Sequence, residues 1–208
     1  MNKILTTKEI AQISTKLHEQ NKQIVLAGGC FDLLHIGHIV FLESAKKYGD
    51  TLIILLESDE TITAIKGPKR PINTQNDRAQ ILAALAVVDY VVLLDPQMNN
   101  NAYDNLVITL KPAIIATTEG DVNRKHKERQ AQMVEAKVAD VTMPITDKST
   151  TKLIKLLNEF KDNESDLEVE LFDPDYGNSK IYRILLDDNK LILTSYFHGK
   201  GKILWEDD

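Results

Sequence analysis

The 208-residue chain has a single cysteine, Cys30, and therefore cannot form an intramolecular disulfide. It has no run that approaches the roughly 20 apolar residues of a membrane-spanning helix. The segment 1–5 leads into polar residues without the apolar core of a secretion signal. These absences argue against a disulfide-stapled secreted domain and against an integral membrane protein, so the cytoplasm is the expected location.

Positive charge is also in short supply. The chain has 25 Lys and Arg against 31 Asp and Glu, a net charge of -6. Any affinity for phosphate must therefore come from a local cationic patch that works against the field of the whole protein, which argues against nucleic acid as a partner. A small anionic substrate fits better. The hydrophobic content of 43% is sufficient for a core, and the length suits one domain with a modest appendage.

Neither the dinucleotide-binding glycine motif nor the phosphate-cradling loop with Lys-Ser/Thr occurs in the chain. A different phosphate-binding corner is present instead. The apolar run 24–27 predicts a buried strand, Gly28 and Gly29 follow it, and the segment 35–38, His-Ile-Gly-His, opens a helix. Two histidines so spaced are by themselves more typical of a polar surface pair. After a strand and two glycines, however, they face one side of a helix start that attracts phosphate, which predicts a nucleotide site.

Strand and helix patterns alternate along most of the chain. This alternation predicts an α/β fold over residues 1–160, a Rossmann-like parallel sheet with helices on both faces. The expected helices are 6–20, 37–48, 76–85, 103–110, 124–136 and 150–160, and the expected strands are 23–28, 51–56, 90–94, 113–116 and 140–143.

The pattern changes at about residue 161, after which short strand-like runs are separated by turn residues. We expect strands at 167–171, 180–186, 190–196 and 202–205. They predict a small C-terminal antiparallel β meander over 161–208. Its simplest role is to cover an apolar face or to mediate self-association, and substrate recognition is the alternative.

Four motifs in order along the chain carry a family resemblance: the segments 28–38, 66–73, 76–78 and 149–152. They resemble the cytidylyltransferase-like nucleotidyltransferase superfamily, and most of all the heptose-1-phosphate adenylyltransferase domain of bifunctional heptose kinase/adenylyltransferases. The resemblance covers residues 1 to about 160. It implies transfer of a nucleoside monophosphate, AMP from ATP by preference, to a sugar phosphate such as heptose 1-phosphate, with release of pyrophosphate. The implied partners are a nucleoside triphosphate and a small phosphorylated acceptor.

The resemblance also implies site residues. His35 and His38 would bind the α/β phosphate region and stabilise the transition state, while Lys66 would fold over the phosphates. Arg78 would either pair with a phosphate or brace a carboxylate such as Asp59. The implied nucleotide-binding set is Gly29, Cys30, Phe31, Asp32, Arg78, Asp121, Ser149 and Thr150. Mg2+ is expected with the triphosphate, bound by phosphate oxygens and water, so no protein metal ligand is expected.

Two departures from that branch fall where the acceptor and the nucleotide base are recognised. Gly28 stands where the branch favours asparagine, and the segment 117–122 replaces a Lys-Gly pair followed by Asp-Tyr. The alternatives are therefore a cytidylyltransferase acting on glycerol 3-phosphate or a phospho-amino-alcohol, and a non-catalytic nucleotide-binding regulatory protein. Asp32 is expected to orient a histidine or the turn. Relatives are commonly dimeric, so the resemblance also allows a homodimer.

Overall fold

The computed structural model describes residues 2–96 and 98–143, and the backbone of four strands between 167 and 206. The chain divides into two compact units, Met1–Thr150 and Thr151–Asp208. Among the described residues, no helix has both the length and the apolar character needed to span a bilayer. The helix expected at 150–160 lies outside the described residues.

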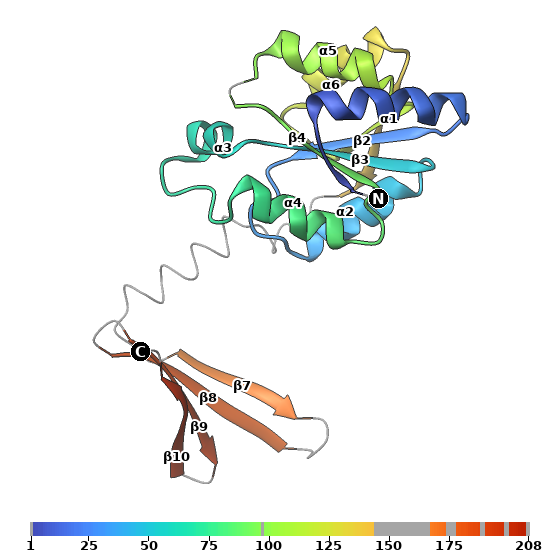
Figure 1. Ribbon diagram of the computed structural model, residues 1–208. Helices are drawn as coiled ribbons and strands as arrows, with labels where there is room; N and C mark the ends of the chain where they lie inside the picture. Colours follow the sequence, from blue (N-terminus) through green and yellow to red (C-terminus); the bar gives the residue numbers. More distant parts are fainter. Residues whose placement is uncertain are drawn as a thin grey trace. The chain divides into compact units, whose positions relative to one another are not determined.

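The described strands of the first unit form one parallel sheet in the order β1-β4-β3-β2-β5-β6 (Figure 1). They are β1 (Ile4–Thr6), β2 (Ile24–Gly29), β3 (Thr51–Leu56), β4 (Tyr90–Leu93), β5 (Ile114–Thr118) and β6 (Lys137–Thr142). All six residues of β3 are buried, as expected for a strand with helices over both of its faces. The predicted Rossmann-like α/β architecture is confirmed.

Helices cover both faces of this sheet (Figure 1). They are α1 (Thr7–Glu19), α2 (Ile36–Lys46), α3 (Asp59–Lys66), α4 (Gln75–Ala84), α5 (Asn100–Leu110) and α6 (Arg124–Met133). The alternation along β2 separates two cores. Val25 and Ala27 pack with α2 and α4, whereas Ile24 and Leu26 pack with α1, α5 and α6.

Two elements have no counterpart in the sequence prediction. β1 has only three residues, too few for a recognisable pattern, and it exists because it pairs with β4. α3 follows β3 directly and begins after Ser58, whose hydroxyl accepts the N–H of Thr61. Its short length and its single buried apolar residue, Ile62, give it little of the periodicity that predicts a helix. This helix places Lys66 in its last turn.

The sheet order creates a switch point between β2 and β5. From β2 the chain continues to β3 on one side, and β5 lies on the other side of β2. In open parallel sheets the crevice beyond the carboxyl ends of two such strands is where ligands bind. This crevice lies beside the glycine and histidine segment that follows β2.

The described strands of the second unit form an antiparallel sheet in the order β10-β9-β8-β7. They are β7 (Leu167–Asp173), β8 (Asn178–Asp187), β9 (Lys190–Phe197) and β10 (Lys200–Glu206). The pairing of β9 with β10 shifts register between Ile203 and Trp205.

Candidate functional site

A pocket of about 260 Å³ lies at the switch point of the first unit. It is lined by Gly28, Gly29, Cys30, Phe31, His35, Gly37, His38, Phe41, Thr118, Asp121, Lys127, Thr142 and Met143. The fold therefore brings six of the predicted site residues, from two distant segments, to one cavity. They are Gly29, Cys30, Phe31, His35, His38 and Asp121.

The two histidines are stacked at the start of α2. Their ring centroids lie 3.8 Å apart with 24° between the ring planes. The backbone N–H of His35 donates a hydrogen bond to Nδ1 of His38 over 3.3 Å. Because Nδ1 accepts this bond, we assign the proton of the neutral His38 ring to Nε2. His38 can therefore donate a hydrogen bond from Nε2 without first being protonated.

Phe31 supports His38 from the preceding turn. Its backbone has φ of 44°, a left-handed conformation that is strained for a bulky residue. Its ring lies 5.1 Å from the His38 ring, centroid to centroid. Gly29 leaves room for this ring, since a Cβ added there would lie only 3.0 Å from Cε2 of Phe31. The glycine, the strained turn and the imidazole thus form one packed unit.

The pKa values of both imidazoles lie below the ordinary histidine value. Burial, with smaller contributions from the charges of His35 and Lys66, lowers the pKa of His38 to about 4. Burial also lowers the pKa of His35. A bound phosphate would oppose these effects and raise both pKa values, because an adjacent anion favours the imidazolium form.

The depressed pKa of His38 predicts a pH dependence of stability. Between pH 6.5, the ordinary histidine pKa, and the folded value of about 4, the unfolded chain binds more protons than the folded one. We therefore expect the free energy of unfolding to decrease as the pH falls through this window. His38→Gln should lose less stability over the same range. Urea unfolding at several pH values tests this, and parallel decreases in the two proteins would contradict a partly buried, neutral His38.

The pocket is also lined by a partly buried ion pair. Nζ of Lys127 and the hydroxyl of Thr117 each donate to Oδ2 of Asp121 over 2.7 Å. Burial would raise the pKa of Asp121, but the hydrogen bonds from Lys127 and Thr117 outweigh it and lower the pKa below its usual value. Asp121 is therefore a charged, fixed acceptor. The sequence predicts a helix around Lys127 without singling this lysine out, because the packing of α6 decides that it faces the pocket.

Asp32 acts on the loop that follows α3. Its carboxylate is buried and accepts hydrogen bonds from Nε of Arg70 and from the N–H groups of Ile72 and Asn73. The side-chain amide of Asn73 donates back to the carbonyl of Asp32 over 3.0 Å. Asp32 therefore orients the turn rather than a histidine. Asp32 does not line the pocket.

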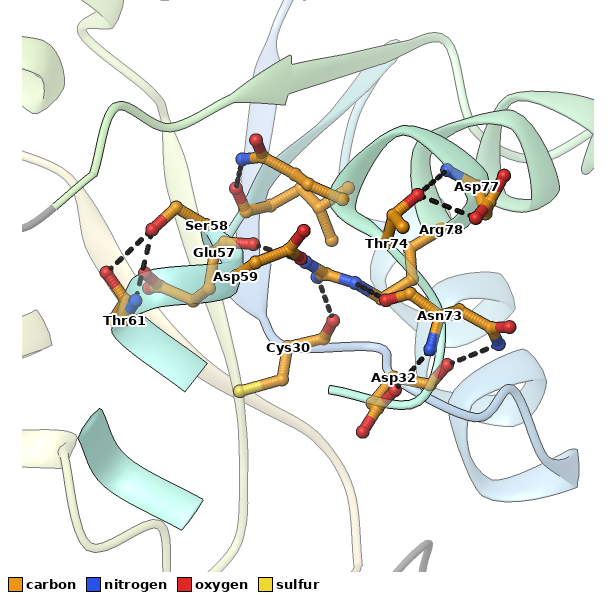
Figure 2. Close-up of polar contacts among 12 residues, drawn as sticks. Cys30, Asp32, Glu57, Ser58, Asp59, Thr61, Asn73, Thr74, Asp77 and Arg78 are labelled. Carbon is orange, nitrogen blue, oxygen red and sulfur yellow. Dashed lines mark hydrogen bonds and ion pairs between the residues drawn. The ribbon is translucent and has the colours of Figure 1, made fainter. Parts of the chain in front are cut away.

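Arg78 is the centre of the polar network beneath the site (Figure 2). Its side chain is fully buried. Nη1 donates to the carbonyl of Cys30 over 2.6 Å, and Nε donates to the carbonyl of Asn73 over 3.1 Å. Nη2 donates to the carbonyl of Glu57 and to Oδ1 of Asp59. Of the two sequence alternatives, the contacts match the bracing of Asp59, and the predicted contact with a nucleotide phosphate is not made by this buried group.

Lys66 lies beside the pocket rather than in its wall. Burial raises the pKa of the Cys30 thiol, and the nearby Lys66 ammonium opposes that effect. The same ammonium lowers the pKa of His38. It therefore lies within Coulombic reach of both. Ser149 and Thr150 lie outside the described residues.

The described residues do not build a metal cage. Nowhere in that part of the chain do three His, Cys, Asp or Glu side chains come together in a way that could hold an ion. Asp121, the carboxylate in the pocket, is already bound to Lys127.

Comparison with known proteins adds to this geometry. A family model described as cytidylyltransferase-like matches residues 26–163. The chain is 41% identical over 156 residues to Bifunctional protein HldE of Aliarcobacter butzleri, covering 75% of this chain and 31% of that protein. It is 38% identical over 158 residues to Bifunctional protein HldE of Geobacter sulfurreducens, covering 74% of this chain and 30% of that protein. The chain thus spans about a third of the length of these curated relatives.

Proposed function

The chain belongs to the cytidylyltransferase-like family of nucleotidyltransferases, and from that premise we propose that it transfers AMP from ATP to heptose 1-phosphate and releases pyrophosphate. The observation that carries the proposal is the stacked histidine pair in the pocket at the switch point, with a donor at Nε2 of His38. The motifs resemble the adenylyltransferase domain of heptose kinase/adenylyltransferases, and the relatives named HldE favour this acceptor over glycerol 3-phosphate or a phospho-amino-alcohol.

The proposed reaction needs positioning and charge neutralisation rather than a covalent intermediate. An oxygen of the acceptor phosphate attacks the α-phosphorus of ATP in line, and the bond from that phosphorus to the bridging oxygen of the β-phosphate breaks. Pyrophosphate leaves with the electron pair of that bond. Negative charge on the transferring group is stabilised by fixed donors in the pocket. We expect Nε2 of His38 and the ring of His35 to supply these donors.

The other site residues are proposed to bind the two anions. The amides of the segment 29–31 approach the triphosphate, and the Lys66 ammonium neutralises phosphate charge on the neighbouring side. Asp121, kept charged by Lys127, accepts a hydrogen bond from a hydroxyl of the nucleotide or acceptor. The hydroxyls of Ser149 and Thr150 would bind the β and γ phosphates.

The family reaction generally involves a divalent metal, and we propose Mg2+ bound to the triphosphate. Among the described side chains, no three His, Cys, Asp or Glu come together to hold an ion, and phosphate oxygens and water are proposed to supply most of its ligands. When bound, the ion would screen the triphosphate charge.

A substrate matrix tests the proposed function. Pyrophosphate release is measured with ATP, CTP, GTP and UTP, each combined with heptose 1-phosphate, glycerol 3-phosphate and phosphoethanolamine. We expect ATP with heptose 1-phosphate to exceed every other pair by at least about tenfold in kcat/KM. Strict dependence on CTP would contradict the adenylyl transfer. If none of the pairs released pyrophosphate, the proposed enzymatic activity would be contradicted.

A further inference from the structure

A second polar pair lies at the same edge of the sheet, beyond β3 and β4. Tyr103, in the first turns of α5, donates a hydrogen bond from its hydroxyl to Oε2 of Glu57 over 2.6 Å. Glu57 directly follows β3, and its backbone N–H donates to the carbonyl of Gly29 over 3.2 Å. Glu57 therefore stands next to the end of β2, beside the pocket but outside its wall. The reaction steps above assign no role to this pair.

The Glu57 carboxylate, held by the Tyr103 hydroxyl, is a fixed hydrogen-bond acceptor. Burial raises the pKa of Glu57, although the hydrogen bond from Tyr103 and the charge of Arg78 oppose this. Burial and the bond to Glu57 also raise the pKa of Tyr103, so the phenol keeps its proton. Among the described residues, no donor other than the Tyr103 hydroxyl reaches the Glu57 carboxylate. Oε1 is therefore available to a hydroxyl on a ligand.

Charges around Glu57 connect its carboxylate to the pocket. The Glu57 charge acts on the thiol of Cys30, which lines the pocket, and the Lys66 ammonium acts on the same thiol. Glu57 and Lys66 thus both lie within electrostatic reach of Cys30. The Lys66 ammonium also acts on His38. Because Glu57 is hydrogen-bonded to Gly29, which lines the pocket, a ligand in the pocket can extend its body toward Glu57.

The geometry of in-line transfer indicates which of the two substrates extends toward Glu57. The pocket between β2, β5 and β6 suits the nucleotide, and the attacking group must approach the α-phosphorus from the side opposite the leaving pyrophosphate. The ends of β3 and β4, on the other side of β2, are the remaining part of the edge. Provided that the proposed function holds, the acceptor body lies there.

We propose that Glu57, positioned by Tyr103, determines acceptor specificity by accepting a hydrogen bond at Oε1 from a hydroxyl of the sugar phosphate. A sugar hydroxyl fits better than an ammonium group. Arg78 already places a positive charge near this carboxylate, so a further cation would meet repulsion. A polyol donates without bringing charge.

The test compares Glu57→Gln and Tyr103→Phe with two matched variants, Glu60→Gln and Tyr48→Phe, whose side chains are exposed away from the pair. We expect Glu57→Gln to lower kcat/KM for heptose 1-phosphate by about 10- to 100-fold, mainly through KM, as loss of a hydrogen bond to a charged group does. Tyr103→Phe should act in the same direction by roughly 3- to 10-fold. The KM for ATP should stay within about twofold in all four variants.

Singly deoxygenated heptose 1-phosphates separate recognition from a general defect. The wild-type chain should discriminate strongly against one deoxy analogue, and Glu57→Gln should lose that discrimination while keeping the others. If Glu57→Gln lowered kcat/KM equally with every analogue, or did not lower it at all, the role of Glu57 in acceptor specificity would be overturned, and the proposed function would stand. Wild-type chain that releases no pyrophosphate with any sugar phosphate would overturn the proposed function as well. Thermal unfolding checks each variant, and Tyr103→Phe carries the test if Glu57→Gln fails to fold.

Discussion

Replacing His38 by alanine is expected to lower kcat by at least about a hundredfold, the scale of losing one preorganised transition-state donor. The variant should remain folded, because the ring is only partly buried and its one described hydrogen bond is the long one from the N–H of His35. Nε2 is the atom responsible, since Nδ1 is occupied by that bond. The KM for ATP should change much less than kcat, because the donor matters most when charge develops.

The measurement is steady-state pyrophosphate release, with circular dichroism to confirm the fold. His126→Ala is the matched control, because that ring is exposed on α6 and does not line the pocket. It should leave kcat within about twofold of wild type. His38→Asn should recover part of the loss if the amide can donate in place of Nε2. Near-normal turnover in His38→Ala would refute the role proposed for the histidine pair.

Replacing Arg78 by methionine is expected to reduce the free energy of unfolding of the first unit by about 3 kcal/mol or more. The aliphatic side chain would approximately fill the space but would leave the carbonyls of Cys30, Glu57 and Asn73 without their donor. It would also leave Asp59 without its ion pair. The unpaired buried acceptors account for the lower free energy of unfolding, because water reaches them poorly in the folded state.

Urea unfolding followed by circular dichroism at the helical band measures this loss, because the helices that the structure describes all lie in the first unit. Arg124→Met is the control. Its guanidinium also pairs with carboxylates, those of Glu128 and Asp140, but all three side chains are at least 36% exposed, and exposed ion pairs contribute at most about 1 kcal/mol. If the two variants lost equal stability, the network in Figure 2 would not be the brace inferred from its contacts.

The signals by which the sequence predicts a site after β2 are local. The apolar run, the glycines and the histidines that follow lie within one strand, turn and helix start, and the same segment lines the pocket. Contacts between distant segments have no such signal. Arg78 reaches Cys30 across 48 positions, and Tyr103 reaches Glu57 across 46. No periodicity in the chain specifies either pair.

Alternating strand and helix patterns were enough to determine a parallel sheet with helices on both faces, and they predict a phosphate-binding corner after its first long strand, because period and turn chemistry are properties of neighbouring residues. Tertiary packing alone decided the burial and the partners of the polar side chains. It buried Arg78 and Asp32 as braces, turned Lys127 into the pocket and left an oxygen of Glu57 without a described partner. A side chain's solvent exposure and partners depend on how the elements pack, which no single segment of sequence specifies.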